Sequence, residues 1–105
     1  MTQDAIPMQS SLLEVSVKVP QHVVYRSFPS ETVVLNLETG KYHGLNSTAG
    51  QMLEEMERAG SLREAAATAA AAFEQPPGEI EADMCELCQA LLERGLLEID
   101  GSGGA

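Results

Sequence analysis

The chain has 105 residues, of which 44% are apolar and only 4% are aromatic. A chain of this length can bury one hydrophobic core, so we expect a single domain whose core is built from Leu, Val, Met and Ala. The formal net charge of −10 repels nucleic-acid phosphates and anionic lipids, which argues against nucleic acid and membrane as partners.

No apolar run is long enough to cross a membrane or to direct secretion. Two cysteines, Cys85 and Cys88, are too few for a disulfide scaffold and fit a reducing compartment. We therefore expect a cytoplasmic protein. Residues 1–14 are polar and unpatterned, and residues 101–105 are rich in glycine, so both ends are expected to be mobile tails around one domain at residues 15–100.

The first half of this domain has the period of two that is typical of strands. β-branched residues between Val15 and Tyr25, interrupted by Pro20, predict one or two short edge strands. Residues 32–37 and 41–45 predict an antiparallel hairpin whose tight turn uses the positive φ of a glycine, Gly40. The residues of its first strand fall into two sets, with Val33, Leu35 and Leu37 on one side and Val34 and Asn36 on the other.

After residue 45 the period changes to 3.6, which predicts helices. Asn46 or Ser47 caps a first helix that ends at Gly60. A capping box of Ser61 and Glu64 opens a second helix, which the two prolines at 76 and 77 end. The apolar residues on these two helices are Ala49, Met52, Leu53 and Met56, then Leu62, Ala65, Ala66, Ala69 and Phe73.

A third helix begins near Pro77 or Gly78 and runs to Arg94, where Gly95 ends it, and "LLEI" predicts a last short strand. Its apolar residues form two stripes: a main one of Ile80, Met84, Leu87 and Leu91, and a narrower one of Cys85, Cys88 and Leu92. The narrower stripe either packs on the first strands or lines a groove that receives a guest. Strands followed by helices predict an α+β, winged-helix-like domain, in which a small three-stranded antiparallel sheet precedes a three-helix bundle.

The sequence contains no set of residues that is typical of catalysis, and it does not predict a cofactor. Cys85 and Cys88 lie within a helix, whereas a thioredoxin-like pair begins one. Zinc would need two further ligands, and His22 and His43 are distant in sequence. We therefore expect neither an enzyme nor a metal site.

Two other classes of protein share some of these features. A winged-helix DNA-binding protein has a similar architecture, but the third helix carries many acids and only one base, Arg94. An acidic carrier protein would bear a prosthetic arm on Ser61, yet carriers are all-helical and Ser61 is better explained as a helix cap. Both remain weakly supported alternatives.

The order of these elements resembles the PqqD family, the peptide-recognition domains of pathways that make natural products from ribosomal peptides. The resemblance covers residues 20–100, from "TVVLNLETG" and "KYHGLN" to "LLERGLLE". The residues on which it rests most are Leu35, Gly40, Tyr42, Leu45, Asn46, Asp83, Gly95 and Leu96.

This resemblance implies a stand-alone peptide chaperone that binds the leader segment of a precursor peptide as an extra strand and presents it to a modifying enzyme. The enzyme would be a radical SAM maturase or a lasso-type leader protease. The implied site is the edge strand Lys41, Tyr42, His43, Gly44 and Leu45, with Met84, Cys85, Cys88 and Leu92 as the helix wall of a groove. Because an open edge can also pair two copies, we expect a monomer or a weak homodimer.

Overall fold

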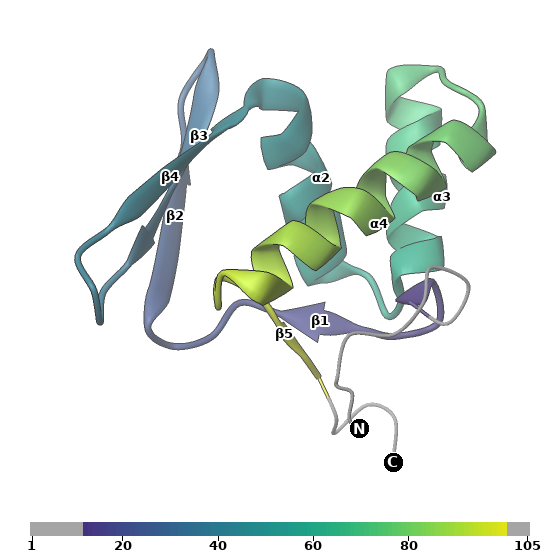
Figure 1. Cartoon of the computed structure of the whole chain (residues 1–105). Helices are drawn as coiled ribbons and strands as arrows, with labels where there is room; N and C mark the ends of the chain where they lie inside the picture. The colour runs from purple at the N-terminus through teal and green to yellow at the C-terminus, as the bar shows by residue number, and fades with distance from the viewer. Residues whose placement is uncertain (1–11, 101–105) are drawn as a thin grey trace.

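The computed structural model describes residues 12–100, and the α+β architecture is confirmed (Figure 1). The strands are β1 (Val17–Lys18), β2 (Val23–Ser27), β3 (Glu31–Asn36), β4 (Tyr42–Asn46) and β5 (Glu98–Ile99), and the helices are α2 (Ser47–Arg58), α3 (Leu62–Phe73) and α4 (Pro77–Glu93). A three-stranded antiparallel sheet has the order β2-β3-β4. It stands at one end of the molecule, with α2 between the sheet and α3.

The predicted run of strand residues before residue 26 divides between two sheets. Pro20 ends the first part, and its carbonyl accepts a hydrogen bond of 3.0 Å from the amide of Val23. β1 does not join the main sheet but pairs antiparallel with β5, with Val17 opposite Ile99. The last short strand is thus confirmed, and the two ends of the domain are joined to each other.

The core begins earlier in the chain than the sequence pattern predicts. Leu12 is 0% exposed and Leu13 is 7% exposed, although both fall in the stretch assigned to a tail. The carbonyl of Leu13 accepts a hydrogen bond of 2.9 Å from the amide of Arg63 at the start of α3, and Glu14 forms an ion pair with the same arginine. Residues 1–11 and 101–105, the rest of the two expected tails, lie outside the described residues.

The predicted helix caps are confirmed. Oδ1 of Asn46 accepts a hydrogen bond of 2.8 Å from the amide of Ala49, and Oγ of Ser61 accepts one of 3.2 Å from the amide of Glu64. The Glu64 carboxylate accepts a hydrogen bond from the amide of Gly60, one residue before the Ser61 amide that a capping box normally uses. These local bonds satisfy amides that the first helical turn leaves without partners.

One side of the sheet packs against the helices. Val23, Thr32 and Val34 are buried against the helices. Val33 and Leu35 therefore point to the other side, because neighbouring residues of a strand face opposite ways. A row of apolar side chains is left on the outer face of the sheet, where a single-layer sheet normally carries polar residues.

Candidate functional site

The hairpin of β3 and β4 is held by an asparagine that the sequence analysis did not single out. Oδ1 of Asn36 accepts hydrogen bonds from the amides of Glu38 and Thr39, at 2.9 and 3.3 Å. Gly40 has φ of +75°, as the turn requires. An Asn that ends a strand just before a turn is the sequence signal for such a bond.

The backbone of β4 has free hydrogen-bonding groups along its outer edge. The amide of Asn36 donates a 2.8 Å hydrogen bond to the carbonyl of Lys41, which makes this the first bonded pair of the ladder. Bonded and non-bonded pairs alternate in an antiparallel ladder, so the N–H and C=O groups of Tyr42 and Gly44 point away from β3. In the part of the chain that the structure describes, no strand pairs with this edge.

The structure places all five residues predicted for the edge strand together. Tyr42 is 71% exposed and lies with Gly44 on the outer face, while His43 and Leu45 face the helices and are half-buried. Lys41 is exposed at the hairpin end of the strand. A strand added here would therefore meet half-buried side chains on one face and an open surface on the other.

At the opposite edge of the sheet, two side chains on the inward face of β2 are hydrogen-bonded to α2. The Tyr25 hydroxyl donates a hydrogen bond to the Glu57 carboxylate, and the Ser27 hydroxyl donates one of 2.9 Å to Glu54. Burial, together with the bond to Glu57, raises the pKa of Tyr25 above its ordinary value. Two inward side chains of β2, Tyr25 and Ser27, are thus bonded to α2, whereas the imidazole of His43 on β4 has no hydrogen-bond partner within residues 12–100.

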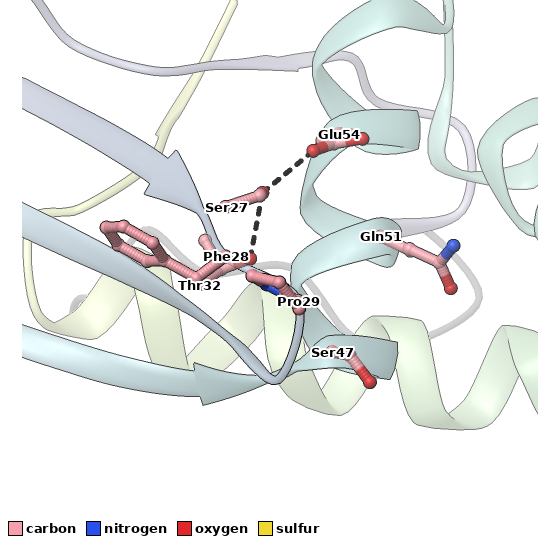
Figure 2. Close-up of a pocket in the computed structure, with 7 residues that line it drawn as sticks. All are labelled: Ser27, Phe28, Pro29, Thr32, Ser47, Gln51 and Glu54. Carbon is pink, nitrogen blue, oxygen red and sulfur yellow. Dashed lines mark hydrogen bonds between the residues drawn. The ribbon is translucent and has the colours of Figure 1, made fainter.

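A polar pocket of about 430 Å³ lies between the β2–β3 turn and α2 (Figure 2). The Ser27 hydroxyl lies near its centre and bonds both Thr32 and Glu54. Its lining residues are Ser27, Phe28, Pro29, Thr32, Ser47, Gln51 and Glu54. It contains none of the residues predicted for peptide binding, and three of its polar side chains, those of Ser27, Thr32 and Glu54, are joined by hydrogen bonds.

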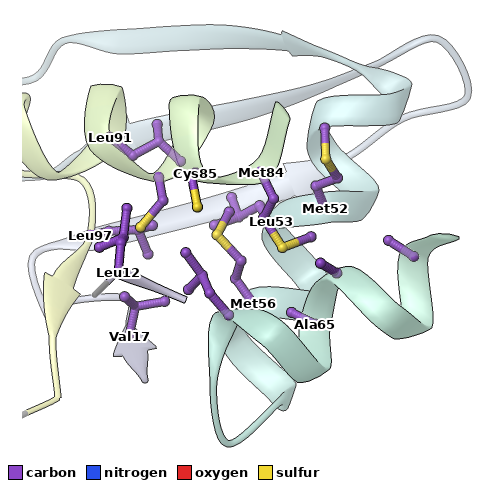
Figure 3. Packing of buried hydrophobic residues seen from close by; sticks show 14 of the residues in the cluster. Leu12, Val17, Met52, Leu53, Met56, Ala65, Met84, Cys85, Leu91 and Leu97 are labelled. Atoms are coloured by element: carbon purple, nitrogen blue, oxygen red, sulfur yellow. The ribbon is translucent and has the colours of Figure 1, made fainter. Parts of the chain in front are cut away.

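Three of the four residues predicted on α4 belong to the core (Figure 3). Met84 and Cys88 are 0% exposed and Cys85 is 2% exposed, so they offer no surface to a guest, while Leu92 is half-buried. Burial raises the pKa of the Cys88 thiol to about 12, and burial followed by Glu81 raises that of Cys85. Of the two alternatives for the narrower stripe of Cys85, Cys88 and Leu92, packing in the core describes the two cysteines.

The flank of α4 that bears Cys85 faces the start of α3. Arg63 of α3 forms an ion pair of 3.8 Å with Glu81, one turn before Cys85. The opposite flank carries Asp83, Leu87 and Ala90, of which Asp83 is exposed and the other two are half-buried. The sequence analysis placed Leu87 in the main stripe of the core. The sequence pattern alone does not separate the centre of that stripe from its two borders, because the difference depends on how neighbouring elements pack around the helix.

The outer face of the sheet carries exposed large hydrophobic side chains. Val24, Leu35 and Tyr42 are opposite one another across the three strands, and Phe28 and Leu37 extend this row beyond the strands. A hollow of about 390 Å³ on this face is lined by Val24, Tyr25, Arg26, Phe28, Val33 and Leu35. Side chains of this kind, gathered on one face, are typical of a protein-binding surface.

Neither a metal-binding cluster nor a membrane-spanning helix is found within residues 12–100. No three His, Cys, Asp or Glu side chains of this range are grouped closely enough to hold a metal ion. Within the same range, every helix is too short or too polar to cross a bilayer.

Comparisons with known proteins agree with this geometry. A solved structure of TbiB1 in complex with the TbiA(beta) leader peptide is 27% identical, with a TM-score of 0.69 over 77% of this chain and 94% of that one. A lasso peptide synthetase B1 complexed with its leader peptide has the same fold, at 20% identity and a TM-score of 0.70 over 79% of this chain and 98% of that one. No curated protein matches the chain. The family model described as coenzyme PQQ synthesis protein D matches residues 31–97, which is more than half of the chain, and the chain therefore belongs to the PqqD family.

Proposed function

We propose that this protein binds the leader segment of a ribosomally made precursor peptide as a fourth strand on β4. The observation that carries the proposal is the outer edge of β4, where the backbone groups of Tyr42 and Gly44 point away from the sheet. Main-chain bonds to such an edge supply affinity, and pockets for alternate side chains supply specificity. The structural likeness to TbiB1, solved with a leader peptide, supports this choice of ligand.

Alternate side chains of the added strand would enter a groove between β4 and α4. We assign His43 and Leu45 to the sheet side of this groove and the flank of Leu87 and Ala90 to its helix side, whereas Leu92 lies on the other flank, with Cys85. The buried Met84, Cys85 and Cys88 support this wall from behind. A guest of about ten residues buries on the order of 1,000 Å², which suffices for a reversible complex of roughly micromolar Kd.

Amide hydrogen exchange tests the strand addition residue by residue. In the free protein, the amides of His43 and Leu45 should exchange slowly, because they are bonded to β3, and those of Tyr42 and Gly44 should exchange fast. Adding a leader peptide, taken from the precursor encoded beside this gene, should slow Tyr42 and Gly44 by at least about tenfold.

The amides of Tyr25 and Ser27, which point away from β3 along the outer edge of β2, provide the control, because they should keep their rates when β4 is the site. Equal protection of both edges, or unchanged exchange at Tyr42 and Gly44 with a peptide that binds, would contradict the proposed site.

We further propose that the protein is not itself a catalyst and that it presents the leader to a modifying enzyme, a radical SAM maturase or a lasso-type leader protease. The outer face of the sheet is the surface we assign to that enzyme, since it is apolar and adjoins the peptide edge through Tyr42. A second copy is disfavoured there, because both copies carry a net charge of −10.

Val24→Asp separates the two roles, because Val24 is exposed on β2, the strand farthest from the peptide edge. We expect unchanged affinity for the leader and at least about tenfold weaker association with the enzyme. Unchanged enzyme association would contradict the assignment. The assignment would also be contradicted if sedimentation showed that the unaltered protein is a dimer and that Val24→Asp abolishes this dimer.

A further inference from the structure

We propose that the outer face of β4 at Gly44 is a subsite for one basic residue of the bound peptide, a Lys or an Arg, with the Glu31 carboxylate as its partner. The inference rests on the proposed function, because it names a side chain that a strand added to β4 would carry. The subsite lies on the face of the sheet that points away from the helices. The groove between β4 and α4 would receive the peptide side chains that point the other way.

Gly44 leaves an opening in this outer face. It is paired with Val33, and Glu31 is paired with Asn46, so Gly44 and Glu31 are diagonal neighbours on the same face. A Cβ at residue 44 would lie 3.3 Å from Oε1 of Glu31. The carboxylate therefore reaches across from β3 and lies over the backbone of the edge strand.

The Glu31 carboxylate is available to a guest. It is exposed, and within residues 12–100 its side chain forms neither an ion pair nor a hydrogen bond. Arg26 is paired with Val33 on the same outer face but forms no ion pair with Glu31. A cation on the added strand would thus meet carboxylate oxygens that the described part of the protein does not use.

A long basic side chain fits the shape of this opening. The residue opposite Gly44 on an added strand also faces outward, and its methylene stem can cross the glycine against Val33 while its charged head reaches Glu31. An acidic residue at the same position would place two carboxylates side by side on a protein of net charge −10. The subsite should therefore prefer a base over a neutral residue, and a neutral residue over an acid.

Selection from short random peptides displayed on phage tests the subsite without knowledge of the natural leader. Protection of the Tyr42 and Gly44 amides identifies the selected peptides that bind as a strand. For these, we expect Arg and Lys to be enriched at one position, and replacement of that residue by Gln to raise Kd about threefold.

The variant Glu31→Lys should instead enrich Asp and Glu at the same position. The matched control is Glu38→Lys, which changes the net charge equally but lies in the exposed hairpin turn, and it should keep the preference for Arg and Lys. In Glu31→Gln, peptides with Arg and with Gln at the position should bind equally well.

Two different failures can be told apart. If Glu31→Lys selects the same residues as the unaltered protein, or if Glu31→Gln keeps the threefold preference, the subsite is refuted while strand addition stands. If no selected peptide protects Tyr42 and Gly44, the proposed function itself is refuted.

Discussion

Among single residues, Gly50 decides how closely α2 approaches the sheet. A Cβ at residue 50 would lie 2.7 Å from Cβ of Thr32, and it would come closer still to the Thr32 hydroxyl. Thr32 is buried in β3 and bonded to Ser27, so it cannot move aside easily. We predict that Gly50→Ala lowers the free energy of unfolding by about 2 kcal/mol, although Ala favours a helix by about 1 kcal/mol over Gly.

Urea denaturation measures this effect, and Gly78→Ala is the matched control. Gly78 is also helical, but no atom lies within 4 Å of the position that its Cβ would take. This variant should be neutral or slightly stabilising. A destabilisation of both variants by similar amounts would show that the cost is not caused by contact with Thr32.

The thiol of Cys88 should make the fold sensitive to alkali. Burial raises its pKa from 9.0 to about 12, so the folded protein keeps a proton that the unfolded chain loses above about pH 9. The stability that this difference contributes is complete below about pH 9 and is lost as the pH rises toward about 12. We predict that the free energy of unfolding falls as the pH rises from about 9 to about 10.5, and that it falls less in Cys88→Ala.

Alkylation by iodoacetamide gives an independent measurement of the same thiol. Cys88 should react at least about tenfold more slowly in the folded protein than in urea, because only the exposed thiolate is a nucleophile. Rapid alkylation of the folded protein would indicate a reactive cysteine and contradict the packing role.

Local chemistry explains which single residues the sequence predicts well. Asn46, Ser61 and Gly40 act within four residues of their own position, through a cap or a turn, and the structure confirms each of them. The contact of Gly50 with Thr32 joins positions 18 residues apart in the numbering of the chain, and only the packed fold brings them together. No local pattern predicts such a contact.

At the scale of elements, the β3–β4 hairpin depends on Asn36. Its side-chain oxygen accepts two amide hydrogen bonds from the turn that sets the register of β4. We predict that Asn36→Ala costs about 1–2 kcal/mol of unfolding free energy, and that Asn36→Asp, which keeps the acceptor, costs less than half as much. Thermal unfolding of the two variants compares them, and equal losses would show that the amide group itself has another role.

Element boundaries were largely predictable, whereas the side on which an element is buried was not. The change of period near residue 46 locates the start of α2, and the hairpin was found from Gly40 and its flanking strands. However, β3 has apolar residues on both faces and α4 has two apolar stripes. Their burial depends on which neighbours pack against them, so Met84, Cys85 and Cys88 were assigned to a surface that they do not reach.

The whole molecule is closed by pairing between its two ends. β1 near the start of the domain pairs with β5 at its end, and the backbone of residues 13 and 15 is bonded to the first residues of α3. The sequence of residues 1–14 does not predict this role, because it is mostly polar and its two leucines, Leu12 and Leu13, show no periodicity. The fold class could be predicted from the order of strands and helices, but the closure of the ends could not.

The N-terminal segment should therefore be required for stability. Leu12 is 0% exposed and lies in the cluster that includes Met56, Leu62 and Leu97. We predict that Leu12→Ala lowers the free energy of unfolding by about 3 kcal/mol, because it leaves a cavity in the core. Leu37→Ala is the matched control: Leu37 is 56% exposed in the hairpin turn, so its truncation should change stability by less than about 0.5 kcal/mol.

Urea midpoints of the two variants, measured with and without a leader peptide, link this stability to function. Because Leu12 lies in the core and not on β4, its truncation should shift the midpoint without changing Kd for the leader at low temperature, where the variant stays folded. If Leu12→Ala left the urea midpoint almost unchanged, the segment around Leu12 would not belong to the part of the protein that unfolds cooperatively. A large loss of leader affinity in the folded variant would instead show that the N-terminal segment shapes the peptide site.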